Sequence, residues 1–257
     1  MEDLQKCKSG RDEESIRGGV EDMKILNLYA GIGGNRKLCG DEHEITAVEN
    51  VPEIAKIYQD FFPKDKVVIA DAHQYLLEHY KEFDFIWSSP PCPTHSRVRK
   101  QLAFRKGKNG ERYEQNKPVF PDMKLYEEII FLDNYFDGKW VVENVIAFYE
   151  PLIEPLKLGR HFIWSNFEIP IIEVKGGTHQ SSIKEMAKHK GFDISNWKIK
   201  HRKDTILRNC VNSKLGLHIL NMAFKSKQEL LTNVIQNKEK SNEEKSSSSK
   251  LNASFVQ

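Results

Sequence analysis

From Lys24 onward, short apolar runs alternate with amphipathic stretches, and this rhythm constrains the fold more than any other feature of the sequence. Five of the runs are compact and rich in β-branched or aromatic side chains, as is typical of strands buried on both faces of a sheet. They are KILNLY (24–29), EITAVEN (44–50), KVVIAD (66–71), FDFIWSS (83–89) and KWVVENV (139–145).

The stretches between these runs are predicted to be helical. Apolar residues recur at i, i+3, i+4 and i+7 after Pro52, and a similar stripe follows Asp122. Strand alternating with helix over residues 24–145 predicts a doubly wound α/β fold on a mostly parallel sheet, where ligands bind beyond the carboxyl ends of the strands. The two stripes consist of Ile54, Ile57, Tyr58 and Phe61, and of Leu125, Ile129, Leu132 and Phe136.

Composition excludes several classes of protein. The net charge is only +2, so attraction to a polyanion has to come from local clusters of basic residues. The four cysteines lie far apart without a C-x-x-C pair, so we expect a reduced, intracellular protein without a metal site. No apolar run reaches the roughly 18 residues of a membrane span, and the amino terminus is too polar for a signal peptide.

The rhythm loosens after residue 150. GRHFIWSNFEIP (159–170) is predicted to form one further strand, and SKLGLHILNMAF (213–224) a helix that closes the fold. Both ends of the chain are polar, so we expect them to be disordered. The predicted units are a flexible leader (1–22), a main α/β domain (23–170), a small insert (171–207), the closing helix of the main domain (208–225) and a disordered tail (226–257).

A glycine-rich loop, YAGIGGN (29–35), follows the first predicted strand. Its glycines allow a tight turn and a close approach to a ligand, with the amides of a following helix facing it. Such loops serve nicotinamide, flavin, nucleotide and S-adenosylmethionine binders alike, and some are only tight turns. The physics of the loop favours a nucleoside-type ligand. The predicted contacts are Tyr29, Ala30, Gly31, Ile32, Gly33 and Gly34.

Acidic residues end the next two predicted strands. Glu49 is placed to accept hydrogen bonds from ribose hydroxyls, and Asp71 from an adenine amino group. For either residue alone, a helix cap or a solvated strand end is the slightly favoured explanation, but three successive strands with ligand-type ends favour an adenosine site. Asn50 and Ala72 are assigned to the same predicted site.

The segment SSPPCPTHS (88–96) follows the fourth predicted strand. Pro90 and Pro91 lack backbone N–H groups and fix φ, so the strand must end there in a stiff loop. This presents Cys92 where an α/β enzyme would place a nucleophile, although a buried structural cysteine is a common alternative. His95, a lone histidine on a loop, is more typical of a surface residue and is assigned no role.

The segment VVENV (141–145) places an ionisable residue near the carboxyl edge of the sheet. Partial burial is expected to raise the pKa of Glu143 and to suit this residue to sharing a proton. Asn144 supplies an amide that can tie neighbouring loops together. A structural Glu–Asn pair at a turn is the alternative.

A basic stretch, 97–117, follows the cysteine, with eight lysines or arginines against two glutamates. Charged stretches are usually solvated surface loops, but this one adjoins the candidate nucleophile, which favours contact with a nucleic-acid backbone. The predicted nucleic-acid contacts are Ser96, Arg97, Arg99, Lys100, Arg105 and Lys106.

YAGIGG, SPPC and ENV, in this order and at these separations, resemble the cytosine-C5 DNA methyltransferase family over roughly residues 24–224. The resemblance implies a Rossmann-like S-adenosylmethionine-dependent methyltransferase fold with a small target-recognition insert (171–207), in which the target base is flipped out of the duplex. Residues 23–170 then form the catalytic and cofactor-binding domain. The implied cofactor is S-adenosyl-L-methionine and the implied partner double-stranded DNA, and we expect a cytoplasmic or nucleoid-associated monomer.

The resemblance also implies how the site residues share the reaction. Cys92 adds to carbon 6 of cytosine and Glu143 engages the ring nitrogen, which makes carbon 5 nucleophilic toward the sulfonium methyl group. A free thiol is only a few per cent ionised at pH 7, so either the loop lowers the pKa of Cys92 or the base is protonated as attack proceeds. The family further implies cofactor contacts for the glycine loop, Glu49, Asp71, Pro90 and Asn212, a bracing role for Asn144, and a base contact for Arg160.

The chain departs from the family pattern at several positions. Pro93 stands where the family usually has Gln, Leu156 and Leu158 occupy the outer positions of the Q-x-R-x-R element, and the target-recognition region is small. Cytosine-C5 methylation of tRNA and a catalytically silent nucleic-acid-binding protein on the same fold are therefore alternatives. A nicotinamide enzyme, the third alternative, gives no reason for SPPC together with ENV.

Overall fold

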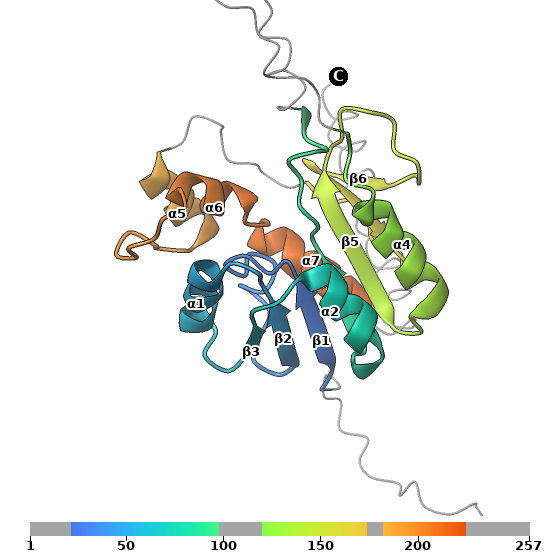
Figure 1. Cartoon of the computed structure of the whole chain (residues 1–257), viewed down its shortest axis with the longest axis horizontal. Coiled ribbons are helices and arrows are strands. Elements are labelled where there is room, and N and C mark those ends of the chain that lie inside the picture. Colours follow the sequence, from blue (N-terminus) through green and yellow to red (C-terminus); the bar gives the residue numbers. More distant parts are fainter. Residues whose placement is uncertain (1–21, 98–119, 174–181, 225–257) are drawn as a thin grey trace, which may run out of the picture.

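The structure is a computed structural model, which describes residues 22–97, 120–173 and 182–224 (Figure 1). The predicted tail lies outside the described residues, as does the predicted leader apart from its last residue. Most of the basic stretch 97–117 also lies outside them.

Among the described residues, seven strands form one sheet in the order β3-β2-β1-β4-β5-β7-β6. Strands β1 to β5 are parallel, whereas β7 is antiparallel to both β5 and β6. The predicted Rossmann-like α/β fold is therefore confirmed. The strand order reverses between β1 and β4, and folds of this type bind ligands at that reversal. The strands are β1 (Lys24–Leu28), β2 (Glu44–Val48), β3 (Lys66–Val68), β4 (Phe85–Ser88), β5 (Lys139–Val145), β6 (Leu156–Leu158) and β7 (His161–Ser165).

Helices cover both faces of this sheet (Figure 1). Alternate side chains of a strand point to opposite faces, so Ile25 and Trp87 pack on the side of α7, while Leu26 and Ile86 pack on the side of α2 and α4. In the described part of the chain no helix is long and apolar enough to cross a membrane. The helices are α1 (Pro52–Phe61), α2 (Ala72–His79), the 3-10 helix η1 (Tyr80–Glu82), α4 (Lys124–Tyr135), α5 (Ile183–Lys190), α6 (Lys203–Asn209) and α7 (Ser213–Phe224).

A third apolar cluster joins α1 to the chain around α5 and α6. Phe192 and Leu207 are fully buried in it, and the rings of Phe61 and Phe192 meet edge to face with their centroids 4.9 Å apart. Helix α5 has its own end signals, since Ser182 forms a capping box with Glu185 at its start. This region therefore packs beside α1 at one end of the sheet, away from β6 and α4 (Figure 1).

The structure differs from the sequence-based expectations at three elements. No helix follows the glycine loop: residues 31–38 form turns, because Gly31 and Gly33 have φ values of +55° and +83° that a right-handed helix cannot contain. Residues 156–165 form two strands, β6 and β7, where one was predicted. Helix α2 was not predicted, because it is only eight residues long and its apolar stripe covers little more than one turn.

Candidate active site

The cysteine loop leaves β4 at Pro90 and turns back at Cys92. The backbone amides of His95 and Ser96 donate to the carbonyl oxygen of Cys92 at 3.0 and 3.1 Å, which closes a tight turn. The side-chain amide of Asn144, on the neighbouring strand β5, donates to the Pro90 carbonyl at 3.0 Å. The side chain of Cys92 is only partly buried. The loop is thus fixed at both ends, with the thiol between them.

His95 holds the far side of this loop, and the expectation of a surface residue is wrong. Its exposed fraction is 1%, and its Nδ1 lies 2.5 Å from the Tyr149 hydroxyl. Its carbonyl oxygen accepts from the backbone N–H of Phe148 at 3.1 Å. Burial lowers the pKa of His95, so the imidazole is held in its neutral form inside the protein. No sequence pattern distinguishes such a residue from an exposed loop histidine.

Glu143 lies at the carboxyl end of β5, beside the cysteine loop, with an exposed fraction of 6%. The Ser89 hydroxyl donates to its Oε2 at 2.9 Å, and Nδ1 of His161 donates to its Oε1. Burial alone would raise the pKa of this carboxyl group, as the sequence led us to expect. That expectation is wrong in sign, because His161 and Ser89 stabilise the carboxylate and lower the pKa of Glu143 below its ordinary value.

Burial raises the pKa of the Cys92 thiol, and the negative charge of Glu143 raises it further. The charge effect places the two groups within electrostatic reach of each other. The sequence left open two ways to activate the cysteine. Because the thiol pKa is raised, the structure excludes the first of them, a loop that lowers this pKa.

Arg160, to which the resemblance assigned a base contact, follows the tight turn at Gly159 and has an exposed side chain. The next residue, His161, is the one that contacts Glu143. The pairing of β5 with β7 places Glu143 opposite Ile163, and side chains two residues apart on a strand share a face. His161 therefore faces Glu143, which the sequence reasoning missed because this contact depends on the register of two strands.

The glycine loop after β1 packs tightly against the protein at two of its glycines. A Cβ on Gly33 would lie 2.3 Å from Phe62, and one on Gly34 would lie 2.4 Å from the Val211 carbonyl oxygen. Gly31, in contrast, faces open space. Close packing of the backbone thus explains two of the glycines, and the loop is open at Gly31. The loop residues Ala30 and Ile32 are buried.

Glu49 and Asp71 lie near the ends of β2 and β3 and bond to the backbone. Both oxygens of Glu49 are engaged, since the amides of Gly31 and Val51 donate to it at 3.0 and 2.9 Å. Each oxygen keeps a second lone pair for another donor. Asp71 is the N-cap of α2 and accepts from the Gln74 amide at 2.9 Å. Of their predicted companions, Asn50 is exposed and Ala72 is buried at the start of α2.

Glu128 of α4 forms a buried polar cluster under this end of the sheet, which the sequence reasoning also missed. Its exposed fraction is 0%, and the hydroxyls of Tyr29 and Ser88 each donate to it at 2.6 Å. Nδ1 of His73 lies 3.0 Å from the same carboxylate, and this hydrogen bond raises the pKa of His73. Glu128 thus joins the end of β1, the start of α2 and the end of β4. Its position on a helix with a regular apolar stripe gave no signal for that role.

Asn212 caps α7, as its Oδ1 accepts from the backbone amides of Lys214 and Leu215 at 3.0 and 3.3 Å. The residue before it, Val211, touches Gly34 of the glycine loop. The structure therefore brings the segment before α7 to the same end of the sheet as the glycine loop.

Two predicted nucleic-acid contacts lie within the described residues. Ser96 forms an isolated β-bridge with Ala147, and the Nε of Arg97 donates to the Ala147 carbonyl at 3.1 Å. Both are therefore anchored to the segment that follows β5. The other four, Arg99, Lys100, Arg105 and Lys106, lie outside the described residues.

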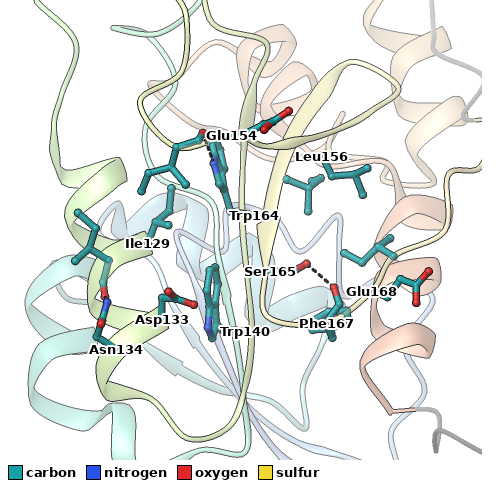
Figure 2. Close-up of a pocket in the computed structure, with 14 residues that line it drawn as sticks. Ile129, Asp133, Asn134, Trp140, Glu154, Leu156, Trp164, Ser165, Phe167 and Glu168 are labelled. Atoms are coloured by element: carbon teal, nitrogen blue, oxygen red, sulfur yellow. Dashed lines mark hydrogen bonds between the residues drawn. The ribbon is translucent and has the colours of Figure 1, made fainter.

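A separate pocket of about 460 Å³ lies beside α4, β5 and β7 (Figure 2). Trp140 and Trp164 line it together with acidic residues such as Asp133 and Glu168. None of the predicted site residues lines this pocket. Across the described ranges, no group of three or more His, Cys, Asp or Glu side chains is arranged to hold a metal ion.

Residues 23–116 match the model of the family described as C-5 cytosine-specific DNA methylase. No curated protein matches the chain. Similar solved structures include an S-adenosylmethionine-dependent methyltransferase from Agrobacterium tumefaciens, with 14% identity over 51% of this chain and 41% of that one and a TM-score of 0.33. A DNMT2 mutant from Spodoptera frugiperda has 28% identity over 48% and 35% of the two chains, with a TM-score of 0.32. The methyltransferase EhMeth from Entamoeba histolytica has 13% identity over 65% and 60%, with a TM-score of 0.35, so this chain covers less than two thirds of each of the three proteins.

Proposed function

We propose that this chain, whose residues 23–116 match the model of the C-5 cytosine-specific DNA methylase family, methylates carbon 5 of cytosine in double-stranded DNA through a covalent adduct to Cys92. The match of residues 23–116 supports methyl transfer with S-adenosyl-L-methionine as the cofactor, and both are part of the proposal. The proposal also covers the polymer, the covalent step and the roles of the individual residues.

The observation that carries the proposal is the meeting of a thiol and a carboxylate at the ends of two adjacent strands. Cys92 follows β4 and Glu143 lies near the end of β5, close enough for the carboxylate charge to act on the thiol. Asn144 holds the proline loop from β5, so the two groups keep their relative positions. A nucleophile and a proton-sharing carboxyl group on either side of a flipped pyrimidine are what addition to carbon 6 requires.

In this proposal Cys92 forms a bond to carbon 6, and Glu143 shares a proton with ring nitrogen 3. The raised thiol pKa makes that proton important, because it neutralises the negative charge that develops on nitrogen 3 as sulfur adds to carbon 6. Arg160 and the basic residues Arg97, Arg99, Lys100, Arg105 and Lys106 are proposed to contact the nucleic acid. Residues 171–207 are proposed as the target-recognition region of the catalytic domain.

The cofactor supplies an electrophilic methyl group when it is bound. The residues near the ends of β1, β2 and β3 fit a nucleoside: Gly31 faces open space, the Glu49 carboxylate is held by two amides and keeps free lone pairs, and Asp71 is exposed. We propose that Glu49 accepts from the ribose hydroxyls and Asp71 from the adenine amino group. Tyr29, Ala30, Ile32, Gly33, Gly34, Asn50, Ala72, Pro90 and Asn212 complete the proposed pocket.

The test is expression of the full chain with a plasmid, followed by bisulfite sequencing of that plasmid. With the wild-type chain we expect cytosines that resist bisulfite conversion because they are methylated. With Cys92→Ser we expect none, because a hydroxyl is a far weaker nucleophile than a thiolate. Cys39→Ala, which removes a buried cysteine from another cluster, is the control and should keep activity. Purified protein should also form a denaturant-resistant adduct with duplex DNA that carries 5-fluorocytosine.

Labelled methyl transfer to duplex DNA and to tRNA separates the proposal from its alternatives. Transfer to tRNA alone would replace the proposed polymer, and no transfer to either would mean a silent binding protein. Full methylation of DNA by Cys92→Ser would disprove the covalent step.

A further inference from the structure

His161 and Glu143 form a pair that connects the candidate active site to solvent. Nδ1 of His161 meets Oε1 of Glu143, while Ser89 occupies the other oxygen. The side chain of Glu143 is only 8% exposed, whereas that of His161 is 25% exposed. A carboxylate only accepts hydrogen bonds, so Nδ1 of His161 carries the hydrogen of this contact. His161 is thus the part of the pair that can exchange protons with water.

The pair resolves a difficulty in the proposed chemistry. Glu143 has to deliver a proton to nitrogen 3, yet His161 and Ser89 outweigh the effect of burial and lower the pKa of Glu143. At neutral pH the carboxyl group is therefore ionised and has no proton of its own to give. The proton has to come from a group in contact with it, and the Nδ1–H of His161 lies against its Oε1.

We propose that His161 is the proton store of the active site, which supplies through Glu143 the proton that nitrogen 3 of cytosine takes up when Cys92 adds to carbon 6. The inference rests on the proposed function. His161 acts through Glu143 and touches no substrate, so it is a positioning residue that also carries a proton.

The step balances in atoms and charge. The Cys92 thiol first loses its proton to water. As the sulfur–carbon 6 bond forms, the pair of the carbon 5–carbon 6 double bond moves between carbons 4 and 5, and the pair of the carbon 4–nitrogen 3 double bond is left on nitrogen 3. That pair takes a proton from Glu143, whose oxygen takes the Nδ1 proton of His161, while Nε2 of the imidazole takes a proton from water. When carbon 5 has been alkylated, nitrogen 3 returns the proton along the same path. The carbon 5 proton then leaves to water, and the sulfur–carbon 6 bond breaks to release the thiolate.

Other charged groups face this pair and will shape its pH dependence. Cys92 lies on the loop after β4, with its thiol pKa raised by burial and by Glu143. Lys190, at the end of α5, is close enough for its charge to act on Glu143, and burial lowers the pKa of its ammonium group. Arg160, just before β7, acts in turn on Lys190. The proton that reaches Glu143 therefore has two candidate sources, His161 and Lys190.

The experiment compares three variants of the full chain in steady-state methylation of duplex DNA across pH. His161→Asn keeps a side-chain N–H near the Nδ1 position but does not titrate, and His161→Phe removes the hydrogen bond as well. Lys190→Arg keeps the positive charge without the lowered pKa. Thermal unfolding of each variant reports the contact with Glu143 independently of turnover, because only His161→Phe leaves the buried carboxylate without this partner.

We expect His161→Asn to unfold near the wild-type temperature yet to lose roughly 100-fold in kcat, the usual size of a general acid–base contribution. The high-pH limb of its pH–kcat profile should move to lower pH, because Glu143 must then be protonated directly from solvent. In Lys190→Arg the same limb should stay at its wild-type position. Wild-type kcat and pH profile in His161→Asn would overturn the inference and leave the proposed function intact. If the high-pH limb of the pH–kcat profile moves in Lys190→Arg and not in His161→Asn, the proton comes from Lys190 and the inference about His161 is also overturned. Absence of methylation by the wild-type chain would instead refute the proposed function, and the inference with it.

Discussion

Two buried carboxylates near the carboxyl edge of the sheet are built in opposite ways. Glu128 is completely enclosed and takes hydrogen bonds from Tyr29, Ser88 and His73, which come from three different segments. Glu143 is nearly as buried, but its partners leave it in electrostatic reach of a thiol. A fully hydrogen-bonded polar cluster fixes the structure around it, whereas a carboxylate beside a thiol changes the ionisation of that thiol. The same residue type is therefore structural at Glu128 and acts on the candidate nucleophile at Glu143.

The hydrogen bonds to Glu128 also explain the unusual backbone conformation of Tyr29. Tyr29 has a φ of +54°, a conformation that costs a residue with a side chain on the order of 1–2 kcal/mol. Its hydroxyl hydrogen bond to Glu128, at 2.6 Å, holds it there. Burial and the charge of Glu128 raise the pKa of Tyr29 far above its ordinary value, so the hydroxyl remains a donor at every pH at which the protein works. The hydrogen bond from Tyr29 to Glu128 therefore fixes the turn that leads into the glycine loop.

The largest expected effect is on catalysis by Glu143→Gln. The amide can still accept from His161 and contact Ser89, so the fold should be retained, but it cannot pass on a proton. We expect kcat for methyl transfer to fall by roughly 10²–10⁴, with a melting temperature within about 2 °C of the wild-type value. Kinetics and thermal unfolding on one preparation check this. Retention of activity would show that Glu143 resembles Glu128 in being structural.

The matched change Glu128→Gln should reverse the pattern. It removes the charge from three buried hydrogen bonds, which we expect to lower the free energy of unfolding by on the order of 2 kcal/mol. Denaturant titration measures that loss. At a temperature where the variant is fully folded, kcat at saturating cofactor should stay within about threefold of wild type. A large fall in kcat of Glu128→Gln with an unchanged free energy of unfolding would show that the two carboxylates do not differ in this way.

The smallest expected effect is on the ionisation of Cys92. Burial and the charge of Glu143 raise its thiol pKa, and since the thiolate is the reactive form, alkylation at Cys92 should rise about tenfold per pH unit below that pKa. Glu143→Gln removes the carboxylate charge, so the alkylation curve should move to lower pH, whereas Glu128→Gln should leave it in place. Mass spectrometry of the Cys92 peptide after timed iodoacetamide treatment reads this directly. Equal curves for wild type and Glu143→Gln would show that the two groups do not interact.

Much of the architecture follows from local pattern. Strands β1, β2, β4 and β5 and helices α1, α4 and α7 lie where apolar runs and helical stripes predicted them. The periodicity is visible because each of these elements buries a continuous face. Strand β6, with three residues, and helix α2, with eight, are too short to show a clear period, and β3 is shorter than its apolar run.

Local pattern also limits what could be said about the site. The positions of Cys92 just after β4 and of Glu143 near the end of β5 were predictable, because carboxyl ends of parallel strands meet at one edge. The sign of the Glu143 pKa shift was not, because it depends on His161 from an antiparallel strand. The turns after β1 were mistaken for the start of a helix, since glycine loops precede helices in many folds but here two positive φ values exclude one.

The alternation of strand and helix and the ends of the main strands are encoded locally in the amino-acid sequence, and they place the thiol and the carboxylate at one edge of the sheet. Which side chains meet at that edge depends on the folded chain: His161 and not Arg160 contacts Glu143, and Glu128 contacts Tyr29 and Ser88. The two kinds of information differ in the distance along the chain over which they act. Burial periods are set by residues three or four apart along a helix and two apart along a strand, whereas the charge state of a buried carboxylate is set by its nearest neighbours in space, which can come from any part of the chain.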